Sequence, residues 1–393
     1  MRKILTLLSA LVLLTFSACK KDKGPSEELK KQAISNYANI VYNNYADALS
    51  KAQVLKAKVD AFVANPTQAG FDETKQAWLD ARLPYGQTEV YRFYGGPIDD
   101  ANGPEGLLNA WPMDESFVDY VQGNANAGII NDLATYPSIT KSLIESLNES
   151  GGETNISCGY HAVEFLLWGQ DFSSSSAGSR PYTDYLTSGG TANNQARRGE
   201  YLKACTDLIV EQLQYVTEAW APNSNNYRKD FENGNTDLAL THIIQGMGFL
   251  SKGELAGERL EVAYDSQLSE DEHSCFSDNT HTDVRMNALG IKNVFFGSYT
   301  KSDGSTISGT GIYEIIKAKD TDLGEELEED IDESVDACND ILAPFDQQIL
   351  GSNPSGRQTV KTAIDKLKAQ GDKIAVAAQA LGLNITGEEP NEK

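Results

Sequence analysis

Apolar side chains recur at alternating steps of three and four residues in the longest segments of this chain. The first such segment covers residues 34–62 and stops before Pro66, and the last covers residues 360–381. This spacing places the apolar side chains on one face of an α-helix, and proline ends a helix because it lacks an amide hydrogen and its ring clashes with the preceding turn. Similar segments fill most of the chain between these two. The sequence therefore predicts an all-α protein.

The expected helices fall into two halves. Besides the first and last, we expect helices at residues 72–93 with a kink at Pro84, about 137–147, 197–220, 238–261 and 321–336. Residues 223–235, rich in asparagine, are the best candidate for a domain boundary. We therefore predict two helical bundles, residues 34–222 and 236–385. The second half opens with four glycines between residues 246 and 257. Each costs about 1 kcal/mol inside a helix, which indicates a close approach of another helix or a ligand.

The N-terminus has the pattern of an export signal. Two basic residues precede a run of mostly apolar residues from 4 to 18, which is shorter than a membrane-spanning helix and typical of a signal peptide. The run ends Phe-Ser-Ala-Cys, which resembles a bacterial lipobox with Cys19 as the lipidated residue, and residues 19–33 would then form a tether. We predict a signal peptide over residues 1–18 and a lipid-anchored envelope protein at the outer membrane, facing the periplasm or the cell surface. Secretion with cleavage nearby is the alternative.

Charge and cysteine content narrow the function classes. A net charge of −24 argues against binding to nucleic acid or to an anionic membrane surface, because both are negatively charged. It suits cation binding, but solubility alone accounts for it equally well. Four cysteines follow the signal segment, namely Cys158, Cys205, Cys275 and Cys338. In an exported protein they allow up to two disulfides, with three pairings open.

Residues 157–169 form an apolar segment that carries two polar groups. Ser157 is placed to cap a helix and Gly169 to end it, and nearly every residue between them is apolar, so the helix should be buried on all sides. His161 and Glu164, three residues apart, point the same way. Buried polar groups need partners. The two residues are either a structural pair that ties neighbouring helices together or half of a metal site, since imidazole and carboxylate both ligate metals.

Two further polar groupings flank this segment in the sequence. Beside Pro84, one helical face carries aromatic and charged side chains: Trp78, Arg82, Tyr85, Glu89 and Arg92. This face is either the wall of a site or a solvated surface. Residues 271–283 are dense in potential oxygen and nitrogen ligands, including Asp278, His281 and Asp283. We expect the polar members of both groupings to lie near His161, with the arginines paired to Glu89 or directed at an anionic metal complex.

The GxHxxE motif at residues 159–164 has companions elsewhere in the chain. They are the stretches at residues 81–89, 93–99, 258–260 and 276–281. Together these stretches resemble the imelysin-like family of bacterial envelope proteins, once grouped with metallopeptidases and now associated with iron uptake. The resemblance implies two four-helix-bundle-like domains with the site at their interface. It also implies a metal ion at His161 and Glu164, iron or alternatively zinc.

As a peptidase site the motif is incomplete. Zinc peptidases built on one helix use HExxH or its inverse HxxEH, with two histidines and a glutamate. Phe165 occupies the second histidine position here, and only His242, His273 and His281 could supply another imidazole from afar. We therefore expect non-catalytic binding of iron or an iron-bearing small ligand, with an envelope transport component as a further partner. The alternatives are a zinc-dependent metallopeptidase, or a lipoprotein that binds a partner or polysaccharide and whose His–Glu pair is structural.

Overall fold

Helices dominate the computed structural model, which describes residues 24–385. Within that range, the strands β1 (Ser298–Thr300) and β2 (Thr306–Ser308) form one short antiparallel hairpin, and almost all other regular structure is helical. The all-α prediction is confirmed. The predicted signal peptide over residues 1–18 and the lipidated Cys19 lie outside the described residues. No helix of the described part is long and apolar enough to cross a membrane.

The helices follow one another along the chain with short connections in the second half and longer ones in the first. The first half contains α1 (Glu27–Ala64), α2 (Gln68–Gly86), the 3₁₀-helix η1 (Gln87–Tyr91), α3 (Glu105–Leu108), α4 (Glu115–Val118), α5 (Lys141–Leu147), α6 (Gly159–Trp168), the 3₁₀-helix η2 (Tyr182–Tyr185) and α7 (Gln195–Ala219). The second half contains α8 (Tyr227–Asn233), α9 (Thr236–Phe249), the π-helix η3 (Leu250–Glu261), α10 (Val262–Ser266), the 3₁₀-helix η4 (Ser269–Asp271), α11 (Thr280–Phe296), α12 (Ile312–Lys319), α13 (Thr321–Asn339), α14 (Phe345–Ile349) and α15 (Pro354–Ala380).

Helix α1 begins earlier than the sequence suggested. Ser26 caps it by accepting a hydrogen bond from a first-turn amide at 3.2 Å, and acidic residues follow in that turn, where negative charge is favourable. The helix therefore starts at Glu27, and residues 27–33 of the expected tether are helical. It ends at Ala64, close to the predicted stop.

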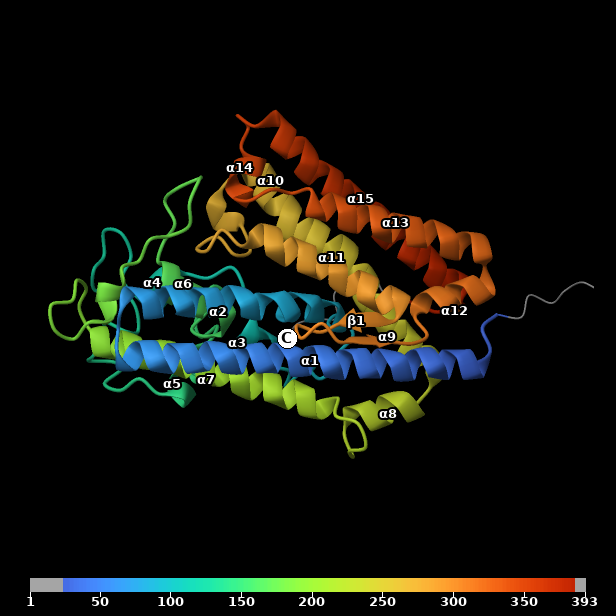
Figure 1. Ribbon diagram of the computed structural model, residues 1–393, viewed down its shortest axis with the longest axis horizontal. Coiled ribbons are helices and arrows are strands. Elements are labelled where there is room, and N and C mark those ends of the chain that lie inside the picture. The colour runs from blue at the N-terminus through green and yellow to red at the C-terminus, as the bar shows by residue number, and fades with distance from the viewer. Residues whose placement is uncertain (1–23, 386–393) are drawn as a thin grey trace, which may run out of the picture.

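Two groups of helices pack side by side (Figure 1). Around α1 lie α2, α7 and, against α7 and α2, the short helix α6; the other group consists of α9 with η3, α11, α13 and α15. Helix α1 also contacts α8, α9 and α12 of the second half. The buried apolar side chains of both groups form one continuous core. The expected boundary at residues 223–235 contains α8, and the division into two domains stays a prediction.

The expected helix at residues 72–93 changes type part-way. Pro84 lies in the last turn of α2 and removes one bond of the helix ladder, after which the chain tightens into the 3₁₀-helix η1. Asn44 of α1 donates a hydrogen bond to the Pro84 carbonyl oxygen at 2.8 Å. This bond anchors the transition to α1.

The expected helix at residues 238–261 also changes type. It is α-helical through α9 and continues as η3, a π-helix, a rare form that is frequent at functional sites. The predicted close approach is confirmed at Gly246, where a Cβ atom would lie 2.5 Å from the carbonyl oxygen of Val90. At Gly257 the nearest atom would lie 3.5 Å away, an ordinary contact, so the prediction is wrong for that glycine.

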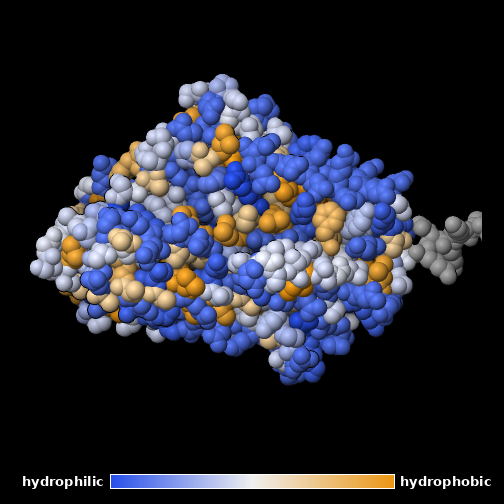
Figure 2. All heavy atoms as spheres, viewed as in Figure 1, coloured by the Kyte–Doolittle hydropathy of each residue, from blue (hydrophilic) through white to orange (hydrophobic). Residues whose placement is uncertain are grey.

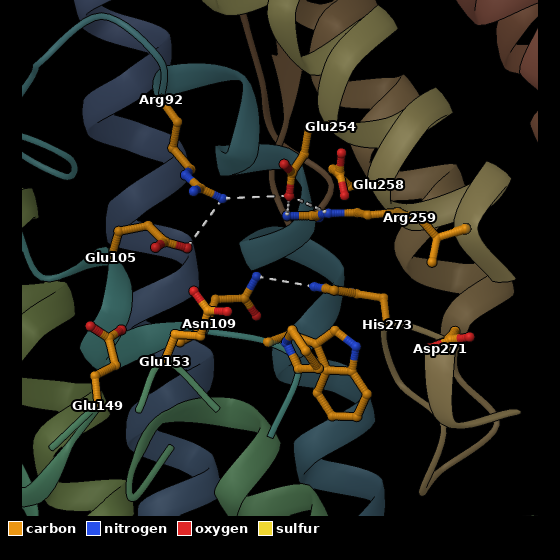
Figure 3. Close-up of a pocket in the computed structure, with 14 residues that line it drawn as sticks. Arg92, Glu105, Asn109, Glu149, Glu153, Glu254, Glu258, Arg259, Asp271 and His273 are labelled. Atoms are coloured by element: carbon orange, nitrogen blue, oxygen red, sulfur yellow. Dashed lines mark hydrogen bonds and ion pairs between the residues drawn. The ribbon is translucent and has the colours of Figure 1, made fainter. Parts of the chain in front are cut away.

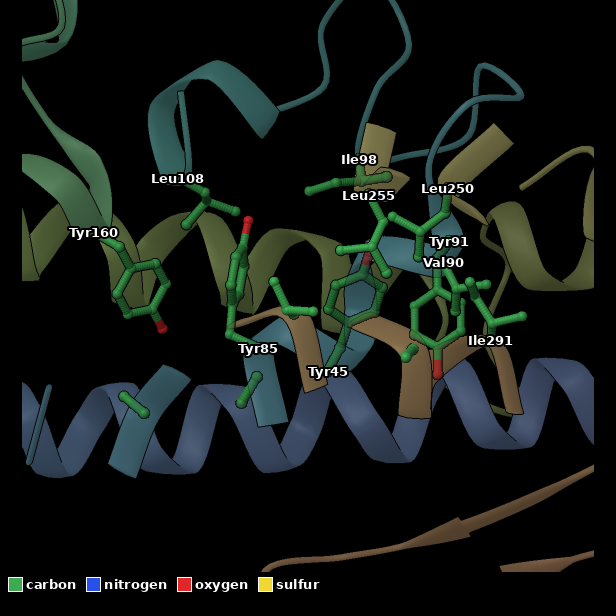
Figure 4. Close-up of a cluster of buried hydrophobic side chains, with 14 of the residues drawn as sticks. Tyr45, Tyr85, Val90, Tyr91, Ile98, Leu108, Tyr160, Leu250, Leu255 and Ile291 are labelled. Atoms are coloured by element: carbon green, nitrogen blue, oxygen red, sulfur yellow. The ribbon is translucent and has the colours of Figure 1, made fainter. Parts of the chain in front are cut away.

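Buried tyrosines pack above α1 in the centre of the core (Figure 4). Tyr45, Tyr85, Tyr91 and Tyr160 are all buried, and the Tyr91 hydroxyl donates to Asn44 Oδ1 at 2.9 Å. On the face seen in Figure 2, hydrophilic side chains predominate and hydrophobic ones are scattered among them.

The four cysteines after the signal segment are buried and unpaired. Each of Cys158, Cys205, Cys275 and Cys338 is a free thiol, so none of the disulfide pairings left open by the sequence forms. Burial raises the pKa of Cys158 and of Cys338 to about 12, so these thiols stay protonated and unreactive.

Candidate functional site

A cavity of about 510 Å³ is lined by residues from both halves of the chain (Figure 3). The first half contributes the end of the η1 segment and the connections around α3 and after α5. The second half contributes η3 and the turn that follows η4. The lining residues are Arg92, Glu105, Asn109, Ala110, Trp111, Pro112, Glu149, Glu153, Glu254, Glu258, Arg259, Val262, Asp271 and His273.

Negative charge dominates the cavity wall. Six carboxylate side chains line it (Glu105, Glu149, Glu153, Glu254, Glu258 and Asp271), against the guanidinium groups of Arg92 and Arg259. A concave surface lined mainly by one sign of charge concentrates counter-ions. The wall therefore favours a cation over an anion.

Both arginines of the wall are paired with carboxylates. Arg92 Nη1 lies 3.0 Å from Glu89 Oε2 and 3.1 Å from Glu105 Oε1. Arg259 Nη2 lies 2.5 Å from Glu89 Oε2 and 2.8 Å from Glu254 Oε1. Burial by itself raises the pKa of Glu89, but Arg259 and Arg92 outweigh it and hold the pKa at about 2. Of the two arginines named from the sequence, Arg92 pairs with Glu89 as one of the expected roles has it, whereas Arg82 pairs with Asp283.

Next to these pairs, His273 is held in one tautomer. Asp283 accepts hydrogen bonds from Arg82 Nη2 at 2.9 Å, from His273 Nδ1 at 2.9 Å and from Ser274 Oγ at 2.5 Å. Burial alone raises the pKa of Asp283, but Arg82 and His273 keep it well below its usual value, while burial lowers the pKa of His273 to about 4. His273 is therefore neutral, with its proton on Nδ1. Its Nε2 faces the Asn109 amide at 3.4 Å.

The GxHxxE motif opens α6 with a glycine that no other residue can replace without strain. Gly159 has a φ of 86°, and a Cβ atom there would lie 2.7 Å from the carbonyl oxygen of Leu108. The predicted cap is wrong by one residue. Cys158 occupies the N-cap position without a side-chain hydrogen bond, and the Ser157 hydroxyl instead donates to a backbone carbonyl of α5 at 2.5 Å. Gly169 ends the helix as predicted.

His161 and Glu164 are completely buried and bonded to each other. Every residue of α6 is buried, as the sequence predicts. His161 Nδ1 lies 2.9 Å from Glu164 Oε2, while Ser277 donates its amide and hydroxyl hydrogens to Glu164 Oε1 at 3.0 and 2.7 Å. Burial lowers the pKa of His161 well below its usual value and raises the pKa of Glu164 to about 8. At neutral pH the pair carries no net charge.

The two buried imidazoles lie side by side, with His273 in the cavity wall and His161 behind it. The rings of His161 and His273 have centroids 4.7 Å apart, and Trp111, which lines the cavity, packs 4.9 Å from His161. His161 Nε2 has no hydrogen-bond partner among the described residues. His273 Nδ1 donates to the Asp283 carboxylate, which is the usual second contact of a metal-bound histidine. His161 Nδ1 instead accepts from the protonated Glu164, so the His161 proton lies on Nε2 and a metal bound there would displace it. His161 Nε2 is thus open to a ligand, whereas His273 Nε2 would have to exchange the Asn109 amide for one.

The remaining residues expected at the site are divided between two places. Tyr85 is buried against Arg82, whose guanidinium carbon lies 5.4 Å from its ring centroid. The chain turns at Asp278, which has a φ of 56°. As a result the Asp278 carboxylate lies among other carboxylates, while the preceding residue, Ser277, bonds Glu164. His281 bonds the Asp278 carbonyl oxygen at 3.1 Å. Neither Asp278 nor His281 is bonded to His161 in the described structure.

Sequence reasoning did not select three important wall residues, His273, Asn109 and Trp111. His273 was named only as one of three histidines that could supply a distant imidazole and lay in the ligand-rich stretch at residues 271–283. A turn separates it from Asp283, so no helical spacing linked the two. Asn109 and Trp111 lie in an irregular connection, whose course is set by tertiary contacts.

Comparison with known proteins places the chain in a family. A sequence model of imelysin (peptidase M75) matches residues 41–374. The chain belongs to the imelysin family. The match includes the GxHxxE helix, η3 and the His273 turn, and the resemblance inferred from the motifs is confirmed.

Relatives of this imelysin-family chain carry names that refer to iron. Iron-regulated protein A of Synechococcus elongatus is 26% identical over 371 residues, which cover 91% of this chain and 88% of that protein. A crystal structure described as an iron-regulated protein A precursor from Parabacteroides distasonis has a TM-score of 0.67 at 18% identity, covering 90% of this chain and 96% of the other. An imelysin-like protein from Psychrobacter arcticum has a TM-score of 0.63 at 12% identity, covering 92% and 98%. At these identities the two structures show a shared fold.

Proposed function

We propose that this protein binds iron, as an ion or as a small iron-bearing ligand, at the acidic cavity and without catalysis. The observation that carries the proposal is the pair of neutral imidazoles, His161 and His273, which lie side by side, each bonded at Nδ1 to an acidic side chain, next to a wall rich in carboxylates. Imidazole and carboxylate are suitable ligands for iron. The name of the Synechococcus relative, iron-regulated protein A, supports iron as the metal.

In this proposal the two histidines bind the iron, and Glu164 orients the imidazole ring of His161. Both oxygens of Glu164 already have partners, so it acts through His161 by holding Nδ1. Direct ligation by Glu164 stays a prediction from the sequence. Within residues 24–385, the two imidazoles belong to no set of three ligand atoms that lie within 4.8 Å of one another. Water or groups carried by the iron species would fill the remaining positions, which suits a site that takes up its cargo and releases it.

A zinc-dependent peptidase is the second candidate, because zinc also binds two imidazoles and the family shares a peptidase class name. Hydrolysis further needs a general base beside the attacking water. Glu164 is committed to His161 and Ser277, and the motif has Phe165 where the inverse zinc motif has its second histidine. A structural His–Glu pair in a partner- or polysaccharide-binding lipoprotein is the third reading, and His161 Nε2, buried without a partner, argues against it.

Iron titration of metal-free protein tests this proposal. His161→Ala and His273→Ala should each weaken iron binding about tenfold or more, because each removes one nitrogen ligand. His242→Ala is the matched control, since His242 stacks on Tyr94 and does not line the cavity. Circular dichroism on each variant checks that the fold is kept. Equal iron affinity in all four proteins would contradict the assignment of the site.

A peptide-cleavage assay on the same preparations separates binding from catalysis. We expect no turnover by the wild type, with or without added zinc. Zinc-restored cleavage that disappears in His161→Ala would replace the binding proposal with the peptidase.

We further propose that the protein is lipid-anchored in the bacterial envelope through Cys19, on the basis of the export signal and the Ser-Ala-Cys ending. Cys19→Ser should move the protein from the membrane fraction to the soluble fraction, because the acyl chains attach through this thiol. Fractionation followed by immunoblotting measures the change. Unchanged retention in the membrane fraction would exclude this anchor.

A further inference from the structure

A second cluster of carboxylates lies apart from the cavity. One oxygen from each of Asp171, Asp278 and Asp346 lies within 4.8 Å of the other two, and none of these residues lines the cavity. The three come from different segments: the connection after α6, the turn before α11 and the short helix α14. Residues from both halves of the chain therefore meet at this cluster.

The most deeply buried member of the cluster, Asp346, has no hydrogen-bond donor among the described residues. Its side chain is only 2% exposed, and neither of its carboxylate oxygens accepts a hydrogen bond from any described residue. Asp171 Oδ2 and Asp278 Oδ1 lack donors as well. Burial of an ionised carboxylate without a donor or a counter-charge is strongly unfavourable. The cluster therefore requires either bound protons or a bound cation.

A fourth carboxylate increases the local negative charge. Glu272 is completely buried beside Asp346, and neither of its carboxylate oxygens accepts a hydrogen bond from a described residue. Burial and neighbouring carboxylates raise the pKa of Asp171 to about 6 and of Asp278 to about 7. A proton shared between Glu272 and Asp346 would relieve that one pair. Asp171 and Asp278 would still face Asp346.

We propose that Asp171, Asp278 and Asp346, supported by Glu272, form a calcium-binding site. Every donor is a carboxylate oxygen, which selects a hard cation over metals that prefer nitrogen or sulfur. Calcium binds oxygens at about 2.3–2.6 Å in irregular geometry, so two oxygens on opposite sides of the ion lie about 5 Å apart. The 4.8 Å limit on the three oxygens accommodates this ion. Asp278 is partly exposed, which leaves a route for the ion to enter.

Calcium at this position would tie together three segments that already touch. The Gly178 amide donates to the Phe276 carbonyl oxygen at 2.9 Å, and the Gln347 side chain of α14 donates to the Ser174 carbonyl oxygen. Ser277, which bonds Glu164, directly precedes Asp278. The bound ion would stabilise the fold and fix the turn that holds the GxHxxE helix. This inference does not depend on the iron proposal.

The test begins with wild-type protein stripped by chelator and dialysed. Calcium chloride is added while isothermal titration calorimetry measures binding and differential scanning fluorimetry measures the melting temperature. We expect saturable binding and a rise in melting temperature. Asp346→Asn and Asp171→Asn should each weaken calcium binding at least about tenfold, because each replaces a charged ligand with a neutral one. Asp336→Asn, on the exposed face of α13, makes the same chemical change outside the cluster and should leave calcium binding unchanged.

Each outcome decides the question. Absence of calcium binding by the wild type, or equal affinity in Asp346→Asn, Asp171→Asn and the wild type, would overturn the site and leave shared protons as the explanation. If Asp346→Asn does not fold, the more peripheral Asp171→Asn supplies the comparison. His161→Ala should keep wild-type calcium affinity whatever happens to its iron binding, so failure of one proposal is distinguishable from failure of the other.

Discussion

Burial of charge does not by itself mark a site in this protein. Asp119, Arg180 and Arg198 form a buried cluster in which Asp119 Oδ2 lies 2.7 Å from Arg180 Nη1 and 2.6 Å from Arg198 Nε. Asp184, whose Oδ2 lies 3.4 Å from Arg180 Nη1, adds the second carboxylate that balances the two arginines, and the cluster lies outside the cavity, so its evident role is structural. Arg180 Nε lacks a partner among the described residues, but a guanidinium group is only a donor and does not ligate a metal. His161 Nε2 also lacks one, and it belongs to an imidazole packed against the cavity-lining His273.

The Glu89 carboxylate should make stability depend on acid pH. Its pKa is held at about 2 against an ordinary value of 4.5, so below pH 4.5 the unfolded chain binds a proton that the folded chain resists. This contribution to the free energy of unfolding is complete above pH 4.5 and is lost as the pH falls through 2. Glu89→Gln should lower the free energy of unfolding by about 3 kcal/mol at pH 7, and the difference from wild type should shrink towards pH 2. Urea unfolding at several pH values measures it, with the exposed Glu329→Gln of α13 as control.

Among the helices, α6 owes its position to a few specific contacts with other segments. Its side chains are apolar and buried all round, so hydrophobic burial fixes it in the core but does not choose its rotation or starting point. The close contact of Gly159 with the backbone of α3 sets the start, and the bonds from Ser277 to Glu164 set the rotation. As a result of both, His161 packs against His273 and Trp111, which line the cavity.

Substitution of Gly159 tests how much the start of α6 matters. Gly159→Ala should lower the free energy of unfolding by about 2 kcal/mol or more, because alanine is strained at positive φ and its Cβ atom would meet the Leu108 carbonyl oxygen. Gly123→Ala is the control: Gly123 has a φ of 84° but open space around its Cβ position, so only the backbone strain of about 1 kcal/mol applies. Urea denaturation compares the two. Equal losses would show that the contact with Leu108 is unimportant.

Across the whole molecule, the two groups of helices share one core. Helix α1 contacts elements of both halves, and the buried apolar side chains are continuous between them. A domain that could fold alone would keep most of its apolar contacts within itself. The shared core indicates that the halves stabilise each other.

The shared core predicts one cooperative unfolding transition. All four tryptophans lie in the first half, at residues 78, 111, 168 and 220, so tryptophan fluorescence reports that half while far-UV circular dichroism reports all helices. The two signals should change at the same urea concentration, since coincident probes are the mark of two-state unfolding. Separate midpoints would instead favour independent domains divided near residues 223–235.

Local pattern determined the helical class, most helix positions and the identity of the GxHxxE segment. Apolar spacing, prolines and terminal glycines act within a few residues, so they are legible in one sequence: residues 34–62 and 360–381 are helical as predicted, and Gly169 ends α6. The pairing of Arg92 with Glu89, three residues away, was one of the two roles expected for the arginines, whereas the pairing of Arg82 with Asp283 was foreseen only as a shared neighbourhood. The Arg82–Asp283 geometry depends on how α2 and α11 pack, which no local pattern encodes.

The sequence by itself therefore determined that a histidine and a glutamate would be buried together on an apolar helix. Only the tertiary structure decided that His273 stands beside His161, that Glu164 is bonded by Ser277, and that Asp278 turns away to join Asp171 and Asp346. These contacts join residues over a hundred positions apart, or lie in turns where one φ angle redirects a side chain. Helical periodicity carries no information about such contacts, because they form only when separate elements pack against one another.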